Sequence, residues 1–95
     1  MKVYRTKKGF IIRSMGDEYL IVAVGEAAET FNGFIRTNRT GAFFWYELEK
    51  GITKEDLVKK MLDKYEDLDE EKANRDLDTY LARMAVAIDV EERAE

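Results

Sequence analysis

The chain of 95 residues contains no cysteine and no histidine. Without these residues it has no disulfides, no thiolate chemistry and none of the usual zinc ligand sets. No apolar run approaches the ~20 residues that span a bilayer, and the basic start lacks the apolar core of a signal peptide. We therefore expect a cytoplasmic protein with no membrane association.

A recognisable catalytic or phosphate-binding arrangement is also missing. The six glycines are scattered along the chain and form no glycine-rich phosphate loop. The acidic segment 67–71 resembles the start of a calcium loop, but Lys72 stands where such a loop needs glycine. The sequence therefore predicts no catalytic residue, no metal site and no cofactor, and it favours a binding protein over an enzyme.

The composition is typical of one small globular domain spanning residues 1–95. Hydrophobic residues make up 45% and charged residues 38% of the chain. A domain of this size buries roughly 60–65% of its unfolded surface, which leaves little room for an enclosed active site. Residues 1–40 carry seven basic and four acidic side chains, whereas the whole chain has a net charge of −4. This asymmetry indicates two differently solvated faces or an acidic partner for the first half. We expect mobile ends at 1–8 and 89–95.

The first third of the chain has the composition of β-strands, being rich in β-branched and aromatic residues. The expected strands are 10–14, 19–24 and 31–37. Gly16-Asp17 can form a tight hairpin turn between the first two. The nearly continuous apolar run of the second predicts a central strand covered on both faces. Residues 25–30 are expected to form a loop. Asn32-Gly33 can form a hairpin turn, but a glycine bulge within the third strand is favoured over it.

Everything after Asn38 has helical periodicity. The expected helices are about 39–50, 53–65 and 69–88, with N-caps at Asn38, Thr53 and Asp69 and a stop at Gly51. Trp45 lies on the apolar face of the first helix and is expected in the core. Three strands followed by three helices predict an α+β domain, with helices packed on one face of a small antiparallel sheet.

Two segments carry a family resemblance: Phe31-Asn32-Gly33, and the pattern Asn-x-Thr-Gly-Ala-x-x-Trp over 38–45, followed by Leu48, Gly51 and Thr53. The sequence resembles the PqqD family, small peptide-binding proteins named for pyrroloquinoline quinone (PQQ) biosynthesis. These proteins are also called RiPP recognition elements, because they serve ribosomally made, post-translationally modified peptides. The similarity runs from about Gly9 to Ile88. Thr37 departs from the family's usual leucine, and Ala87-Ile88 stand where a glycine is common.

The resemblance implies a winged helix-turn-helix-like fold and a function as a peptide chaperone. A leader region of a precursor peptide would add as a strand beside the third strand, in a cleft against the last helix. A partner, typically a radical S-adenosylmethionine enzyme or another peptide-modifying enzyme, would perform the chemistry. The candidate peptide-binding residues are Phe34, Ile35, Arg36, Thr37, Tyr80, Arg83 and Met84.

The sequence allows two roles for each of four of these side chains. Tyr80 and Met84 suit either a peptide groove or the core. Arg36 and Arg83 are plain surface charges or contacts to an acidic leader. The sequence also leaves a homodimer open.

A winged-helix DNA-binding regulator is the alternative function. Winged-helix domains also consist of three helices and a small sheet, as predicted for this chain. The last helical region, 69–88, carries five acids against three bases, which disfavours contact with phosphates. Nucleic acid is therefore not the expected partner.

Overall fold

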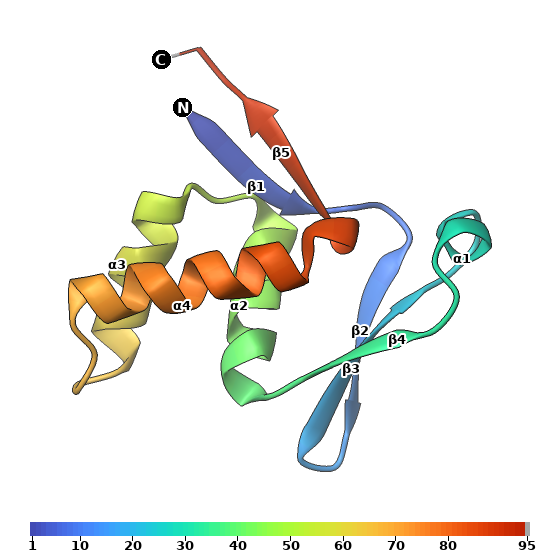
Figure 1. Cartoon of the computed structure of the whole chain (residues 1–95), viewed down its shortest axis with the longest axis horizontal. Helices are drawn as coiled ribbons and strands as arrows, with labels where there is room; N and C mark the ends of the chain where they lie inside the picture. The colour runs from blue at the N-terminus through green and yellow to red at the C-terminus, as the bar shows by residue number, and fades with distance from the viewer. Residues whose placement is uncertain (95) are drawn as a thin grey trace.

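The computed structural model describes residues 1–94 and contains a three-stranded antiparallel sheet, three long helices and a two-stranded ribbon (Figure 1). The strands are β1 (Lys2–Thr6), β2 (Phe10–Met15), β3 (Glu18–Ala23), β4 (Phe34–Thr37) and β5 (Ile88–Glu92). The helices are α1 (Ala27–Thr30), α2 (Arg39–Lys50), α3 (Lys54–Lys64) and α4 (Glu70–Arg83), and a 3₁₀ turn spans Ala85–Ala87. The expected α+β, winged helix-turn-helix-like architecture is confirmed. None of the described helices is long and apolar enough to cross a membrane.

The sheet has the strand order β2-β3-β4, so β3 is central as expected. Met15 pairs with Glu18, which leaves Gly16-Asp17 as the predicted hairpin turn. Gly16 has a φ of +62°, a conformation that costs glycine little because it has no Cβ. A short turn of this kind sets the register of both strands.

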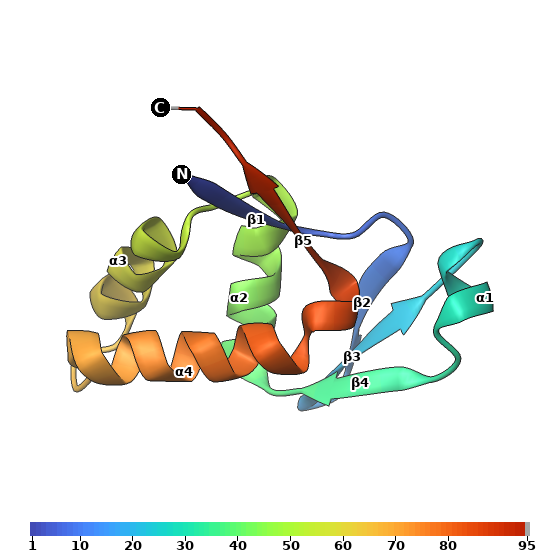
Figure 2. The same ribbon diagram turned by 45° about the horizontal axis from the view of Figure 1, so that its top comes forward.

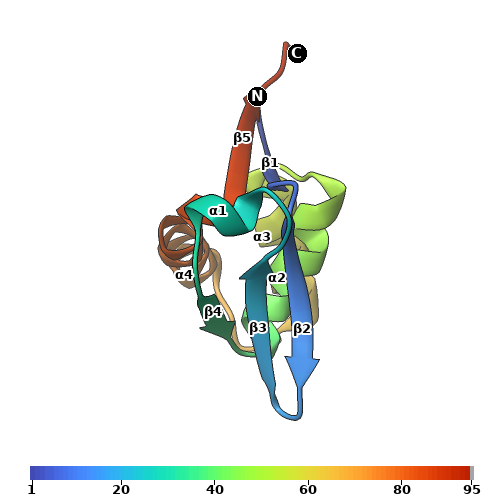
Figure 3. The ribbon, with the colours of Figure 1, turned by 90° about the vertical axis from the view of Figure 1, so that its right-hand side faces the viewer.

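Only one face of the sheet is covered by helices (Figure 3). Ile12, Ile21 and Ile35 are paired across the three strands, and all three pack into the core. Side chains alternate along a strand, so Leu20 and Val22 lie on the opposite face, where they stay half-buried. The expectation that the second strand is covered on both faces is wrong. Neighbouring strands shield its outer side chains partly, and no helix lies over them.

The three long helices begin at the predicted residues because side chains cap their first free amides. Asn38 Oδ1 accepts a hydrogen bond from the amide of Gly41 at 2.9 Å. Thr53 Oγ1 accepts from Asp56 at 3.1 Å, and Asp69 Oδ1 accepts from Lys72 at 2.8 Å. Gly51 ends α2 with a φ of +81°, as predicted.

The core lies between the helices and the inner face of the sheet (Figure 2). Trp45 has no exposed surface, which confirms its expected burial. At the edge of this core, Glu47 joins α2 to α3: Lys60 Nζ lies 3.1 Å and Lys50 Nζ 3.5 Å from its carboxylate oxygens. Burial alone would raise the pKa of Glu47, but the hydrogen bonds and charges of the two lysines outweigh it and lower the pKa.

The chain ends differ from the expected mobile segments. β1 and β5 pair along their whole lengths, from Lys2 opposite Glu92 to Thr6 opposite Ile88. Tyr4 also bonds Ile52 through both of its backbone groups, which ties the ribbon to the α2–α3 connection. This pairing joins segments far apart in the sequence, so local composition does not predict it. Glu95 lies outside the described residues.

Three further boundaries differ from the sequence prediction. Residues 27–30 form one turn of helix in place of a loop. Because Phe31 lies at the end of that turn, the strand begins only at Phe34, and Asn32-Gly33 precede it instead of forming a bulge inside it. The last helix ends at Arg83 and not at Ile88, since the 3₁₀ turn redirects the chain into β5.

Candidate functional site

β4 is an edge strand, and its free side faces α4 (Figure 3). Arg83 reaches across from the end of α4 and donates a hydrogen bond from Nη2 to the carbonyl oxygen of Arg36 at 2.5 Å. The carbonyl of Arg36 therefore points away from β3. Because backbone groups alternate in direction along an antiparallel strand, Phe34 and Arg36 present their N–H and C=O groups to the free edge, while Ile35 and Thr37 bond β3.

Gly41 is the point where β4, α2 and α4 meet. Its carbonyl oxygen accepts a 2.9 Å hydrogen bond from the Tyr80 hydroxyl. A Cβ at this position would lie 1.7 Å from Thr37 Oγ1 and 3.2 Å from Tyr80 Cε1. The three elements thus approach so closely that only glycine fits without a shift. The ring of Phe44 meets the ring of Tyr80 edge-on at 4.9 Å and forms the floor of this junction.

A hollow of about 390 Å³ opens at this junction. We call it the β4–α4 crevice, and it is lined by Thr37, Asn38, Thr40, Gly41, Phe44, Asp76, Thr79, Tyr80 and Arg83. The lining combines aromatic surface with hydroxyl groups and one guanidinium. Such a surface can take up side chains from an extended chain lying along β4.

The charges around the crevice leave its arginines without carboxylate partners. Asp76 is neutralised by Lys72, whose Nζ lies 2.9 Å from its carboxylate. Within residues 1–94, neither Arg36 nor Arg83 forms an ion pair. Burial raises the pKa of the Tyr80 hydroxyl, and the nearby charge of Arg83 opposes this only in part. Tyr80 is therefore a neutral hydrogen-bond donor at physiological pH, and Arg83 is the cation of the crevice lining.

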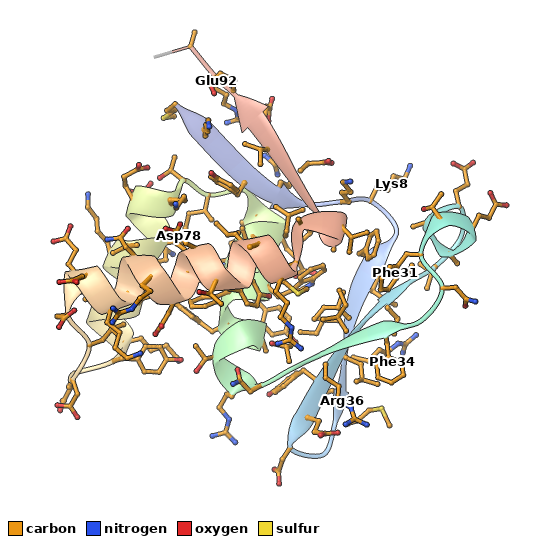
Figure 4. The ribbon with its side chains drawn as sticks, in the orientation of Figure 1. Lys8, Phe31, Phe34, Arg36, Asp78 and Glu92 are labelled. Carbon is orange, nitrogen blue, oxygen red and sulfur yellow. The ribbon has the colours of Figure 1, made fainter. Side chains whose placement is uncertain are left out.

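The outer face of β4 adds an apolar side chain to this edge. Phe34 is 54% exposed, and the guanidinium of Arg36 lies 5.9 Å from the centre of its ring. Figure 4 shows both side chains on the side of β4 away from the helices. Phe34 is paired with Val22, which is paired with Ile11, so the three form an apolar row across the sheet.

The structure brings together most of the residues that the sequence singled out. Arg36, Thr37, Tyr80 and Arg83 surround the free edge of β4, and Ile35 packs beneath it. Met84 differs, because it is 0% exposed and lies in the core. Its predicted direct place in the groove is wrong, since the chain turns after Arg83 and carries Met84 inward. Sequence reasoning missed six lining residues: Asn38, Thr40, Gly41, Phe44, Asp76 and Thr79. The Asn-x-Thr-Gly pattern was the only signal for the first three.

A larger hollow of about 520 Å³ lies between α3 and the start of α4 and shares Thr40 and Asp76 with the crevice. No strand borders it, so it offers no backbone edge to an extended chain. The described residues contain no group of three or more His, Cys, Asp or Glu side chains that could hold a metal ion.

The fold and the crevice define a class of protein: a small α+β domain of winged helix-turn-helix-like architecture that presents a free strand edge beside its last long helix. The sequence model of the family described as "Coenzyme PQQ synthesis protein D (PqqD)" matches residues 18–87. The chain belongs to the PqqD family.

A comparison of structures gives the same fold. The solved structure described as "TbiB1 in Complex with the TbiA(beta) Leader Peptide" matches with a TM-score of 0.70 at 19% sequence identity. The match covers 96% of this chain and 99% of the TbiB1 chain. No curated protein matches the sequence.

Proposed function

We propose that this protein captures the leader region of a ribosomally made precursor peptide by β-strand addition to β4 and presents it to a modifying enzyme. The protein itself performs no chemistry in this proposal. The observation that carries it is the free edge of β4 facing the crevice, with Arg36 and Phe34 presenting their backbone groups outward. Membership of the PqqD family supports the proposal, as does the shared fold of TbiB1, which is described in complex with a leader peptide.

Strand addition uses the backbone N–H and C=O groups that are free on the edge of β4. The amides and carbonyls of Phe34 and Arg36 supply main-chain hydrogen bonds, which do not depend on the peptide's sequence. Alternate side chains of the added strand would point into the β4–α4 crevice and supply specificity. The candidate contacts are Phe34, Arg36, Thr37, Tyr80 and Arg83, with Thr79 and Gly41 added from the crevice lining.

The other edge of the sheet, on β2, is less suited to a peptide. In Figure 3, β2 lies on the side of the sheet opposite α4. A strand added there would gain main-chain hydrogen bonds but would lie away from α4 and from the β4–α4 crevice. We therefore place the peptide on β4, antiparallel to it.

The proposed partner enzyme is a radical S-adenosylmethionine enzyme or another peptide-modifying enzyme, and the proposed location is the cytoplasm. The family resemblance supports this pairing, because such a domain holds a peptide and needs a second protein to change it. A strand seated on β4 leaves the outer face of the sheet open, where Phe34 and Arg36 lie. The enzyme would meet the bound peptide from that side.

The test is peptide binding to the variant Arg36→Pro, with Arg36→Ala as its matched control. Proline removes the outward-facing N–H of residue 36, whereas alanine removes only the side chain. Peptides encoded by neighbouring short reading frames are titrated by calorimetry, and amide exchange locates the binding. We expect Arg36→Pro to lose most binding and Arg36→Ala to keep more of it, with new protection at β4 and α4.

A second proline variant checks the assignment of the edge. The N–H of Ile35 bonds β3, so Ile35→Pro should weaken the sheet itself and lower stability, while Arg36→Pro should not. Equal peptide affinity of wild type and Arg36→Pro, or protection confined to β2 and β3, would refute strand addition to β4.

A further inference from the structure

We infer that the peptide added to β4 is acidic, and that one of its carboxylates draws Arg83 away from the carbonyl of Arg36. This inference rests on the proposed function and concerns the chemistry of its ligand. In the free protein, Nη2 of Arg83 donates a 2.5 Å hydrogen bond to the outward-facing carbonyl oxygen of Arg36. An antiparallel strand on β4 would need that same oxygen for a main-chain hydrogen bond. That oxygen has two acceptor sites, but the guanidinium that bonds it lies on the free side of β4, where the backbone of the added strand must lie, so Arg83 must move before the strand can pair fully.

Displacing Arg83 from the carbonyl of Arg36 is unfavourable when the added peptide has no charged side chain. Arg83 gives up a charge-assisted hydrogen bond, which is stronger than a bond between neutral groups. The added strand replaces that bond at Arg36 with an ordinary amide donor, and the exposed guanidinium of Arg83 is left with water as its only new partner. Arg83 thus acts as a cap on the strand edge, in the manner of the charged groups that protect exposed edges from pairing with other chains.

A carboxylate on the peptide makes the displacement of Arg83 favourable. Within residues 1–94, no acidic side chain pairs with Arg83, although the chain has 20 acidic residues in all. Asp76, the acid in the crevice lining, is held by Lys72 at 2.9 Å. A peptide carboxylate would therefore be the first acid to reach this guanidinium, and it would offer a stronger acceptor than the carbonyl that Arg83 leaves.

Successive side chains of the added strand point to opposite faces, and this alternation determines the position of the acidic residue. The peptide residue that pairs with Arg36 has its side chain on the outer face, as Arg36 does. The residues on either side of it point toward α4, where Arg83 begins. The acid is thus expected next to the residue that pairs with Arg36. The residue that pairs with Phe34 falls beside the exposed ring, at the end of the apolar row, so an apolar side chain is expected there.

The probe is a displayed library of short random-sequence peptides, selected separately on wild type, on Arg83→Ala and on Arg75→Ala. Arg75 is an exposed arginine on the same helix outside the crevice lining, so it controls for loss of charge alone. Amide exchange with each selected peptide shows whether it protects β4. The tightest wild-type binder that does so is then resynthesised with its acid changed to the neutral amide, and both peptides are titrated on all three proteins.

We expect the change from acid to amide to weaken binding to wild type and Arg75→Ala by about tenfold, which corresponds to ~1.4 kcal/mol. On Arg83→Ala the same change should cost less than about twofold, and the neutral peptide should bind this variant more tightly than it binds wild type, because the edge is no longer capped. A residue with only a structural role would weaken both peptides alike.

Two results would overturn the inference. If selected peptides protect β4 but show no enrichment of acids, or the same enrichment on Arg83→Ala, strand addition stands and the role of Arg83 is wrong. If no selected peptide protects β4 on any of the three proteins, the proposed function fails, and this inference fails with it.

Discussion

Replacing Gly41 by alanine tests the junction that shapes the site. In an ordinary helix position this change stabilises a protein by up to about 1 kcal/mol, because alanine has the better helix propensity. Here the new Cβ would lie 1.7 Å from Thr37 Oγ1, 3.0 Å from Thr37 Cβ and 3.2 Å from Tyr80 Cε1. Either the side chain of Thr37 must leave its rotamer or β4 must shift, and the ring of Tyr80 must give way slightly, so overpacking of this kind costs about 1–3 kcal/mol. We expect Gly41→Ala to be destabilised by that amount.

The measurement is chemical denaturation, with the free energy of unfolding taken from the midpoint and slope. Thr37→Ala and the double variant complete the comparison. Removing the hydroxyl at position 37 relieves the shortest contact, so the double variant should recover a large part of the loss. If Gly41→Ala alone is more stable than wild type, the close approach of β4, α2 and α4 is wrong, and so is the shape of the crevice.

Four other measurements test the fold and the function. Trp45→Ala removes a fully buried aromatic side chain and should cost ~3–5 kcal/mol in the same assay; an unchanged midpoint would mean that its burial is wrong. Tyr80→Phe leaves the carbonyl of Gly41 without its 2.9 Å donor and should cost about 1 kcal/mol; equal stability would show that the bond does not form. The pKa of Glu47 is lowered from 4.5, so the stability from its ion pairs is complete above that pH and is lost as the pH falls through the lowered value. Glu47→Gln should thus be less stable than wild type by at most about 1 kcal/mol at neutral pH, and the two should converge in acid. Duplex DNA should bind no better than the non-specific range of ~10⁻⁴–10⁻⁶ M at physiological salt, and a salt-dependent shift at nanomolar protein would instead favour a regulator.

The elements that could be predicted from the sequence are those specified by local chemistry. Asn38, Thr53 and Asp69 cap their own helices within three residues, so each start could be located from the chain alone. The turn at Gly16-Asp17 likewise depends only on neighbouring residues. Trp45 was recognisable as core because helical periodicity places it on an apolar face.

The elements that were missed depend on distant partners. β1 and β5 form because residues at opposite ends of the chain meet, and the charged segment 89–92 has no strand signal of its own. Met84 has the same amphipathic spacing as residues on the helix, yet the helix ends one residue earlier and Met84 turns into the core. A Met84→Glu variant would therefore bury a charge and unfold the protein, so it cannot report on peptide binding.

The direction of the backbone groups on β4 is the property of the site least accessible from sequence. Side-chain alternation indicates that Ile35 and Thr37 face inward, but it does not tell which residues bond β3 and which face the free edge. That choice depends on the register with β3, and it becomes visible here through the bond from Arg83 to the carbonyl of Arg36. Had the other pair of residues faced outward, the carbonyl of Arg36 would be bonded to β3 and Arg83 could not cap it. The proposed need for an acidic residue in the peptide therefore depends on the register between β3 and β4. That register cannot be read from the residue types of the chain.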